Sequence, residues 1–359
     1  MKADSIRLAW RSLRGRIRQT LRRLAWPVRR RAIERRLEVL RSAGDCAPGP
    51  ADCVVAVLVR DAEHLVEPFL EYYLRLGVAH IVLLDNGSQD DTVRRALGVE
   101  RVTVLRCTLP YKHYQMPFKR FLVESYGEGR WCLLVDIDEW FDYPGSGELP
   151  LRGLLRYLDR HRYTSVVAAV LDMFADGPPE SWPQGGREMI DACVWYDPTS
   201  LHRWPDSWLR RVNKFADPEM PMYRGGIRVP VFGRNPMLTR FPLLYYTRGG
   251  RLRLGMNLHA LEGADFADVS VVLRHYKFDR NFVQRWRDTA ERGQDPVHVR
   301  NYQAALGTLE KNPRLVLRGP AARRLVHVNQ LVDEGILRAS AAYWDYVRSH
   351  RTVQDTTAH

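Results

Sequence analysis

The sequence lacks several features that would quickly assign it to a class. It has no apolar run of about 18 residues and no signal-peptide core, so we expect neither a transmembrane helix nor a secretory leader. It has no GxGxxG and no GxxxxGK[ST] after its first apolar run, which disfavours a dinucleotide-binding fold of the usual kind and a P-loop. Its 5 cysteines form no CxxC pair. We therefore expect buried free thiols in a reducing compartment, and neither disulfides nor zinc.

What the sequence does contain is globular in composition but uneven in charge. The chain has 359 residues, of which 45% are hydrophobic and 27% charged, and this excludes a disordered protein. Its formal net charge of +13 is concentrated at the start, because residues 1–45 hold 14 Lys and Arg against 4 Asp and Glu. The remaining residues carry a net charge of only +3. The basic character therefore belongs to an N-terminal arm and does not describe the body.

Within this arm, apolar residues recur every three or four positions among the arginines until Pro27. The pattern predicts a basic amphipathic helix that contacts an anionic membrane surface through residues 1–41. A solvated tail or a helix packed on the body are the alternatives, and a nucleic-acid partner is not expected because the body lacks the patterning of a binding module. Residues 42–52 have the composition of a linker. The apolar positions are Ile6, Trp10, Leu13, Ile17, Leu21 and Leu24.

The body alternates between short apolar runs and amphipathic stretches. Such alternation predicts an α/β fold with a mostly parallel central sheet and helices on both faces. We expect Gly77 to end the first helix of the body. The expected strands are residues 53–59, 80–84, 101–106 and 131–135, and the expected helices are residues 64–76 and a helix around 118–126.

Two carboxylates follow the last of these strands. If the strand continues through the sequence DIDE, Asp136 and Asp138 point to the same side, because side chains alternate along a strand. Two like charges this close are unfavourable unless a cation lies between them, and Mg²⁺ or Mn²⁺ suits such a site. The alternative is an acidic, solvated turn without a ligand.

Several sequence blocks, in order, carry a more specific resemblance. The segment VRDAEHLVEPFLEYYLRLGVAHIVLLDNGSQDDT resembles the opening of family 2-type glycosyltransferases with the GT-A fold, in particular the bacterial branch related to family 92. WCLLVDIDEWFDYP resembles the metal-binding strand of that branch, and VLDMFADGP, GGIRVPVFG, PMLTRFPLLYY and VLRHYKF resemble its later blocks. The resemblance covers about residues 53–285. Asp61 and Arg240 depart from the family pattern, which usually has Asn and Lys there.

The resemblance implies an inverting, metal-dependent transferase. It would move a sugar from a nucleotide-diphosphate sugar, most simply a UDP-sugar, to a glycan, lipid-linked or other acceptor. The bound Mn²⁺ or Mg²⁺ would stabilise the charge on the leaving diphosphate. Asp136 would reach ribose or metal, Asp138 the metal, and His275 would be a third ligand, with His259 as a second candidate. We expect a cytoplasmic protein, peripheral on the inner face of the membrane if the arm binds there.

Further residues are candidates for donor binding and for catalysis. Arg60, Asp61, Asp85, Asn86 and Lys119 are candidates for base, ribose or phosphate contacts, although turn, helix-cap and solvated-helix roles are the alternatives. Arg120, next to Lys119, is a candidate for the same phosphate contact. An inverting transferase also needs a general base to take a proton from the acceptor hydroxyl. The candidates are Asp172, placed first because it ends an apolar run, then Asp176 and Glu262.

The remaining segments divide into an irregular lobe and a helical extension. Residues 177–224 are rich in Pro and Trp, and their aromatic rings are candidates for stacking on an acceptor sugar or for packing. Three helices are expected after residue 285, at 300–310, 321–334 and 340–350. The expected divisions are an arm over 1–47, a catalytic domain over 48–285 and the extension over 286–359. The tryptophans of the lobe are Trp182, Trp195, Trp204 and Trp208.

Three other function classes deserve comparison. A glycoside hydrolase needs two carboxyl groups facing each other across the substrate, and the spacing of Asp136 and Asp138 does not suit this. A metal-dependent nucleotidyltransferase or phosphotransferase on a similar fold is the nearer enzyme alternative. An inactive, membrane-associated binding protein is the alternative that is not an enzyme.

Overall fold

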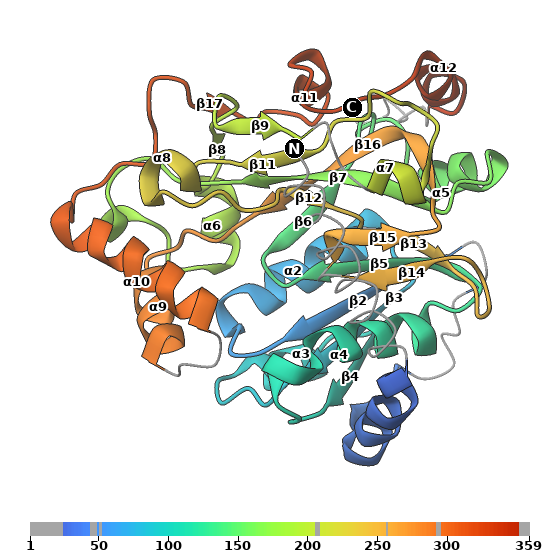
Figure 1. Cartoon of the computed structure of the whole chain (residues 1–359), viewed down its shortest axis with the longest axis horizontal. Helices are drawn as coiled ribbons and strands as arrows, with labels where there is room; N and C mark the ends of the chain where they lie inside the picture. Colours follow the sequence, from blue (N-terminus) through green and yellow to red (C-terminus); the bar gives the residue numbers. More distant parts are fainter. Residues whose placement is uncertain are drawn as a thin grey trace, which may run out of the picture.

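The fold is organised around one large mixed sheet (Figure 1). A computed structural model describes residues 24–43, 49, 52–204, 209–255, 258–291 and 296–351. In these residues the sheet has 11 strands, with the order β1-β4-β3-β2-β5-β13-β7-β16-β10, while β12 pairs with β7 and β6 with β16. The strands are β1 (Glu38–Arg41), β2 (Cys53–Val59), β3 (His80–Asp85), β4 (Val102–Arg106), β5 (Arg130–Asp136), β6 (Glu139–Asp142), β7 (Ser165–Asp172), β10 (Lys214–Phe215), β12 (Thr239–Arg240), β13 (Leu243–Tyr246) and β16 (Asp265–His275).

Most of the long strands run in one direction. β4, β3, β2 and β5 are mutually parallel, and β16 is parallel to β7. β13 is antiparallel to both β5 and β7, so β7 and β16 run in the same direction as β5. The predicted α/β fold with a mostly parallel sheet is therefore confirmed, and it is consistent with the GT-A arrangement that the resemblance implies.

Helices cover both faces of the sheet because its central strands are apolar on both sides. In β2, Val55 and Val57 pack with α2 (Glu63–Leu76) in one core, whereas Val54 and Ala56 pack with α4 (Tyr111–Tyr126) in the other. Gly77 ends α2 in the left-handed conformation, as predicted. The predicted strands and helices of this half are confirmed, although α4 starts seven residues before the expected 118.

The elements after β6 are shorter and build small sheets beside the main one. β9 pairs with β11, β14 with β15, and β8 with β17. The described helices of the C-terminal part include α9 (Phe282–Glu291), α10 (Pro296–Lys311) and α12 (Ala341–Ser349). The other elements are α3 (Thr92–Leu97), α5 (Leu151–Arg160), η1 (Pro179–Ser181), α6 (Gly186–Ala192), β8 (Trp195–Tyr196), β9 (Leu201–Arg203), α7 (Leu209–Val212), β11 (Tyr223–Gly225), α8 (Arg228–Phe232), β14 (Arg253–Gly255), β15 (Ala260–Glu262), β17 (Arg323–Arg324) and α11 (Gln330–Asp333).

Two predictions about the later chain differ from the structure. The helix expected over 321–334 is wrong, because this segment forms the strand β17 and only the short helix α11. Trp182 does not offer a ring for sugar stacking: it is fully buried and packs against Phe282 at a ring distance of 5.2 Å. Trp208 lies outside the described residues.

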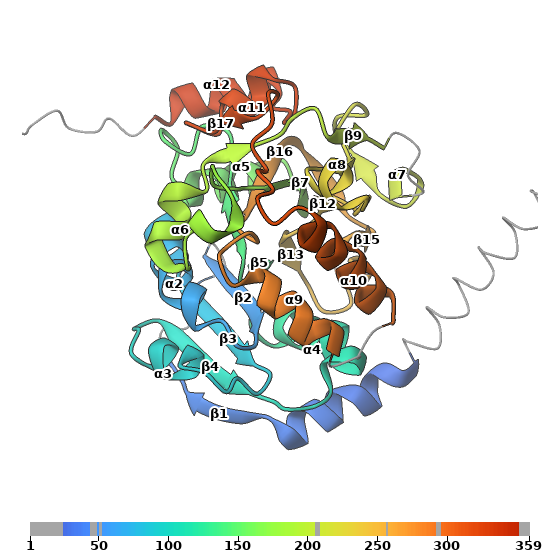
Figure 2. The ribbon, with the colours of Figure 1, turned by 90° about the vertical axis from the view of Figure 1, so that its left-hand side faces the viewer.

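The N-terminal segment joins the body earlier than the sequence suggests. Residues 24–36 form a helix, drawn in dark blue at the bottom of Figures 1 and 2, and it packs on α4 through Trp26 and Ile33. β1 then adds an antiparallel edge strand to β4. The apolar positions Ile6 to Leu21 and most of the expected linker lie outside the described part of the chain. Packing on the body, given above as an alternative, therefore holds for residues 24–41.

Two expectations concern cysteines and membranes. Cys53, Cys107, Cys132 and Cys193 are buried free thiols, and Cys46 lies outside the described residues. Among the described helices, none combines the length and the apolar character needed to cross a bilayer.

Candidate functional site

The candidate site lies where the parallel strands end. The register places Asp85 beside Val59, Asp136 beside Leu58, and His275 beside Asp172. These residues end β3, β5, β16 and β7, so polar side chains from distant parts of the sequence meet at one edge of the sheet. The carboxyl edge of an open α/β sheet is where such folds bind ligands.

The sequence DIDE makes a tight turn instead of a continuous strand. Asp136 is the last residue of β5, Ile137 and Asp138 form the turn, and Glu139 begins β6. β6 then runs back beside β16, with Glu139 opposite His275. The strand alternation expected above does not extend to Asp138. The two aspartates therefore enter two different sets of contacts.

Asp136 belongs to a closed group of charges, here called the Asp136 cluster, with Lys119, Arg240 and Glu139. Its two carboxylate oxygens accept from Lys119 Nζ and from Arg240 Nη1, both at 2.6 Å. Arg240 Nη1 also donates to Glu139 Oε2 at 2.9 Å. Burial tends to raise the pKa of Asp136, but the charges of Arg240 and Lys119 outweigh it and hold that pKa far below its usual range.

The opposite balance acts on Glu139. Its side chain is fully buried, and burial raises its pKa, with Arg240 offsetting part of the effect and Asp136 adding to it. Oε1 of Glu139 is buried and has no hydrogen-bond partner among the described residues. The Asp136 cluster therefore contains one buried carboxylate oxygen that no described donor reaches.

Asp138 belongs to a second group, here called the His275 cluster, with His275, Asp172 and Arg228. His275 Nε2 lies 3.1 Å from Asp138 Oδ2, and His275 Nδ1 lies 2.6 Å from Asp172 Oδ1. Arg228 donates to both oxygens of Asp172, at 2.8 and 3.1 Å. The imidazole is thus held between two carboxylates, one of them fixed by an arginine.

The charges of this group shift its pKa values strongly. Burial lowers the pKa of His275, but Asp138 and Asp172 raise it more, to about 9. Burial raises the pKa of Asp172, but Arg228 and His275 lower it to about 2. For Asp138, His275 outweighs burial in the same way and holds the pKa well below its usual range. At neutral pH a protonated His275 therefore joins two ionised carboxylates.

The donor set of the His275 cluster fits a divalent cation. Metal-binding histidines usually donate their second ring N–H to a carboxylate, and Asp172 is placed to accept it from His275 Nδ1. Nε2 and the Asp138 carboxylate are then one nitrogen and one oxygen donor, which Mn²⁺ accepts. No group of three or more His, Cys, Asp or Glu side chains is arranged for a metal within the described ranges. The protein would thus supply few ligands and leave positions for water and substrate phosphates.

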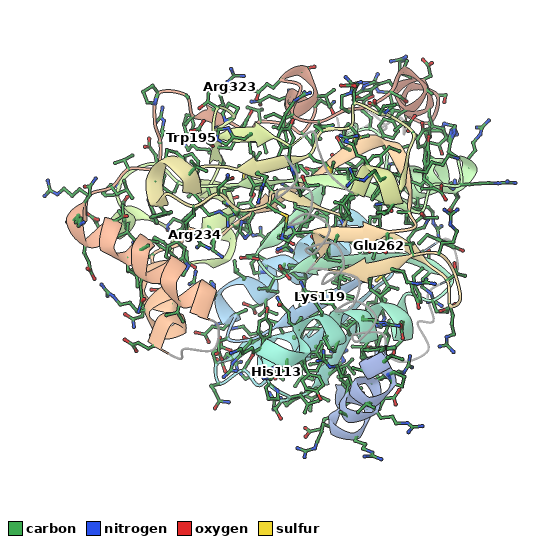
Figure 3. The ribbon with its side chains drawn as sticks, in the orientation of Figure 1. His113, Lys119, Trp195, Arg234, Glu262 and Arg323 are labelled. Atoms are coloured by element: carbon green, nitrogen blue, oxygen red, sulfur yellow. The ribbon has the colours of Figure 1, made fainter. Side chains whose placement is uncertain are left out.

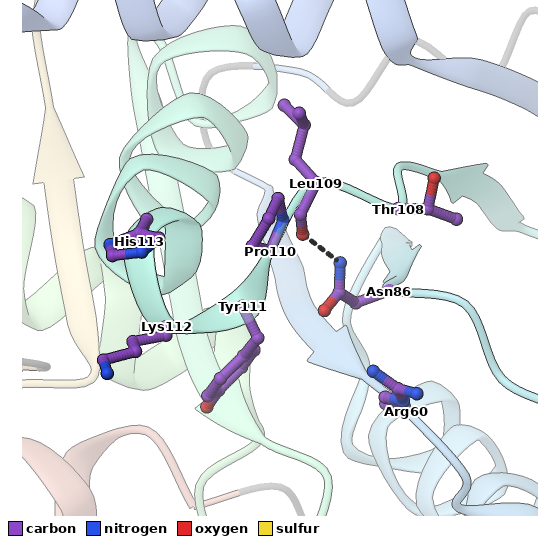
Figure 4. Close-up of a pocket in the computed structure, with 8 residues that line it drawn as sticks. All are labelled: Arg60, Asn86, Thr108, Leu109, Pro110, Tyr111, Lys112 and His113. Carbon is purple, nitrogen blue, oxygen red and sulfur yellow. Dashed lines mark hydrogen bonds between the residues drawn. The ribbon is translucent and has the colours of Figure 1, made fainter. Parts of the chain in front are cut away.

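A pocket of about 240 Å³ opens at the same edge, beyond the ends of β3 and β4 (Figure 4). Two of the predicted donor residues, Arg60 and Asn86, line it together with the start of α4. Asn86 Nδ2 donates to the carbonyl oxygens of Cys107 and Leu109, at 2.7 and 2.9 Å, and so fixes the wall of the pocket. The other lining residues are Thr108, Leu109, Pro110, Tyr111, Lys112 and His113.

Asp85 makes the contacts of the turn role that is the alternative to donor binding. It is fully buried, and its carboxylate accepts from the backbone N–H of Ser88 at 2.9 Å and from Arg106 Nε at 2.8 Å. Because the side chain is fully buried, these contacts leave no exposed oxygen for a nucleotide base. Asp61, at φ 49°, accepts from the backbone N–H of Gln89 at 2.8 Å, which ties the ends of β2 and β3 together.

Lys119 and Arg120 also differ from the expected pair of phosphate ligands. Lys119 is fully buried, and its ammonium group contacts Asp136. Arg120 lies above the ring of Trp26 at 4.3 Å and donates to Glu124. Figure 3 shows Lys119 in the middle of the molecule, above His113, the other labelled residue of α4.

The three candidates for the general base are placed apart from one another. Asp172 is 5% exposed and fully occupied by His275 and Arg228, which explains its low pKa and makes it unsuitable as a base. Asp176 is exposed and pairs with Arg318. Glu262 ends β15 in the small β14–β15 sheet. His259 belongs to neither cluster. Its Nδ1 lies 2.7 Å from the carbonyl oxygen of Thr239.

Sequence reasoning gave no role to three residues of these clusters: Arg228, Arg240 and Glu139. Arg240 stood out only as a departure from the family pattern, and Arg228 only as part of a matching block. The ion pairs of the two arginines depend on distant segments coming together. The pairing of β12 with β7, for example, places Arg240 beside Ala168. A lone arginine in a short strand carries no local signal of such a partner.

No protein-family model matches the sequence, and no curated protein matches it either. Among solved structures, it is similar to glucosyl-3-phosphoglycerate synthase from Mycobacterium tuberculosis, in a complex with Mn²⁺, UDP and glucosyl-3-phosphoglycerate, at 16% identity and a TM-score of 0.22. The alignment covers 38% of this chain and 50% of that one, so it spans about half the length of that protein. A nucleotidyl transferase from Methanothermobacter is also similar, at 16% identity, a TM-score of 0.19, and coverage of 38% and 66%. Similarities this weak do not assign the chain to a family, and neither supports the narrower likeness to family 92.

Proposed function

We propose that this protein is a metal-dependent glycosyltransferase that uses a nucleotide-diphosphate sugar, most simply a UDP-sugar. The observation that carries the proposal is the pairing of Asp138 with His275, which Asp172 orients from behind, at the same sheet edge as the Arg60–Asn86 pocket. A divalent cation on Asp138 and His275 would face the diphosphate of a donor whose nucleoside part lies in the pocket. A metal there would supply stabilisation of the charge that develops on the leaving diphosphate.

The residues around this pair would prepare the site in two ways. Asp172 and Arg228 would act as positioning residues, because they hold the His275 ring with Nε2 toward Asp138. The Asp136 cluster would place fixed charges beside the diphosphate without taking up the metal, since both Asp136 oxygens are bound to cations. The Asp136 side chain, which is 27% exposed, could then accept a further hydrogen bond from a ribose hydroxyl, whereas Glu139 is buried beneath it.

The acceptor hydroxyl must also be activated. With inversion, a base must take the proton of the acceptor hydroxyl. The contacts of Asp172 with Arg228 and His275 argue against this role, so of the sequence candidates we favour Asp176 and Glu262. The acceptor class stays as the resemblance implies, a glycan or a lipid-linked or other hydroxyl compound.

The first prediction tests the metal-binding pair with a readout that does not need turnover. Unfolding temperature is measured with UDP, with Mn²⁺, and with both, for the wild type, Asp138→Asn, and the control Asp345→Asn, an exposed aspartate on α12. A ligand that binds only the folded state raises its stability by mass action. We expect Mn²⁺ to strengthen UDP binding in the wild type and in the control, but not in Asp138→Asn. Turnover in Asp138→Asn should fall by about two orders of magnitude.

The products separate this function from its alternatives. Release of UDP from a UDP-sugar, slow in water and faster with the correct acceptor, supports a glycosyltransferase. Pyrophosphate release from a nucleoside triphosphate and a sugar phosphate would instead indicate a nucleotidyltransferase. Mn²⁺-dependent nucleotide binding without either product would leave a binding protein. An Asp138→Asn variant with the wild-type response to Mn²⁺ would refute the metal site itself.

A further inference from the structure

The helix over residues 24–36 has two different faces. Trp26 and Ile33, 9% and 0% exposed, lie in the core beside α4. Trp26 Nε1 donates to Glu124 at 3.2 Å, and Arg30 Nη1 donates to the same carboxylate at 3.0 Å. The helix is therefore fixed on the body by one face, and the arginine and tryptophan side chains on that face already have partners.

The opposite face carries apolar and basic residues that are exposed. Leu24, Val28, Arg31 and Arg35 are spaced by four, three and four positions, which places them along one side of a helix, turned away from Trp26 and Ile33. Leu24 and Val28 are 71% and 72% exposed, and Arg31 and Arg35 are exposed as well. Within the described residues, Arg31 and Arg35 form no ion pair. We call these four residues the outer stripe.

This combination identifies the chemistry of a partner. Free guanidinium groups attract a surface of negative charge, and exposed leucine and valine side chains gain free energy by leaving water. A nucleic acid backbone would use the charges but not the apolar side chains. We propose that the outer stripe docks this protein on an anionic lipid surface, with Leu24 and Val28 among the headgroups and Arg31 and Arg35 facing lipid phosphates.

The location of the helix gives the docking a consequence for the site. Arg29 Nη1 donates to the carbonyl oxygen of His113 at 3.4 Å, and His113 lines the Arg60–Asn86 pocket. β1, which follows the helix, lies along β4, whose end leads into the same pocket wall. A membrane under the outer stripe would thus lie on the side of the molecule where this helix contacts the pocket wall. The docking itself requires no catalytic activity, so it holds or fails independently of the proposed function.

The second prediction is a flotation experiment with the full chain. Vesicles of phosphatidylcholine alone are compared with vesicles that also contain phosphatidylglycerol, at low and high salt. We expect binding to the anionic vesicles only, weakened by salt because the charges are exposed. Arg31→Glu with Arg35→Glu should lower the partition coefficient about tenfold or more. Leu24→Ser with Val28→Ser should also lower it, at all salt concentrations.

A matched control is available on α5, which lies in the upper half of Figures 1 and 2, away from the helix over residues 24–36 at the bottom. Arg156 and Arg160 are exposed and four positions apart on that helix, so Arg156→Glu with Arg160→Glu makes the same change in net charge. We expect this control to float like the wild type. Equal flotation of the outer-stripe variant and the control would overturn the proposal. The charge variant is also tested for binding to a DNA duplex. If it floats like the wild type but loses binding to the duplex, the outer stripe binds nucleic acid and the proposal is overturned.

Discussion

Asp136 and Asp138 show how contacts decide the role of a residue. Both belong to one short motif, and the pKa of each is held far below its usual range. Asp136 is held by Lys119 and Arg240, two cationic side chains that would repel a metal ion. Asp138 is held by His275, whose proton a metal can replace. The same residue type, two positions apart, therefore suits structural charge pairing in one case and, under the proposed function, metal binding in the other.

His259 gives the third prediction, which concerns pH. Burial and the charge of Arg240 lower its pKa to about 4, so the ring is neutral in the folded protein at neutral pH. An unfolded chain binds this proton from about pH 6.5 downward, and the folded protein resists it until about pH 4. Stability that is present above about pH 6.5 is therefore lost as the pH falls toward 4, by up to about 3 kcal/mol.

The measurement is denaturant unfolding of the wild type and His259→Gln at several pH values between about 4 and 8. The difference between the two free energies of unfolding should stay constant above about pH 6.5. Below it, the wild type should lose more stability than the variant, because only the wild type takes up the extra proton on unfolding. Parallel curves down to pH 4 would show that His259 is not held neutral.

At the scale of elements, strands and helices of the first half followed from local pattern. The run CVVAVLV reads as a strand buried on both faces, and its neighbours alternate in the same way. The prediction of a helix over residues 321–334 failed for a physical reason. The apolar residues of this segment have helical spacing, but the pairing of β17 with β8 fixes Arg323 and Arg324 in an extended form. Tertiary pairing overrode the local preference there.

Trp182 gives the fourth prediction, at the scale of the irregular lobe. Its ring is buried against Phe278 and Phe282, and its Nε1 donates to the carbonyl oxygen of Gly177 at 2.9 Å. Trp182→Ala should therefore lower the free energy of unfolding by about 3–5 kcal/mol, as for other buried tryptophans. Trp204, half-buried and beneath the guanidinium of Arg224, is the matched comparison.

Trp204→Ala should cost much less stability, about 1 kcal/mol, since a partly exposed cation–π pair contributes little. Chemical denaturation of both variants checks the difference. If Trp182→Ala unfolds like the wild type but loses affinity for an acceptor sugar, the packing role is wrong and the stacking role expected from composition is right.

At the scale of the whole molecule, the site depends on pairings that no local pattern reveals. Asp138 and His275 are 137 positions apart, and they meet because β6 and β7 both pair with β16. The sequence predicted the α/β class, the first four parallel strands and the candidacy of both residues. It could not predict Arg228 as the partner of Asp172, or β13 between β5 and β7, because these follow from long-range packing.

The fifth prediction concerns where the folded unit begins. The composition placed a boundary near residue 48, yet Ile33 is fully buried in the same core as Leu122 and Phe118 of α4. If residues 24–41 belong to the cooperative unit, Ile33→Ala leaves a cavity in that core and lowers the global free energy of unfolding by about 2–4 kcal/mol. Val28→Ala, on the same helix but 72% exposed, should change it by less than about 0.5 kcal/mol. A separate arm would behave differently, because neither substitution would then change the unfolding of the body.

Denaturant titration followed by tryptophan fluorescence and by circular dichroism distinguishes the two cases. One coincident transition that shifts only for Ile33→Ala supports a unit that starts before residue 33, whereas an unshifted transition would restore the boundary near residue 48.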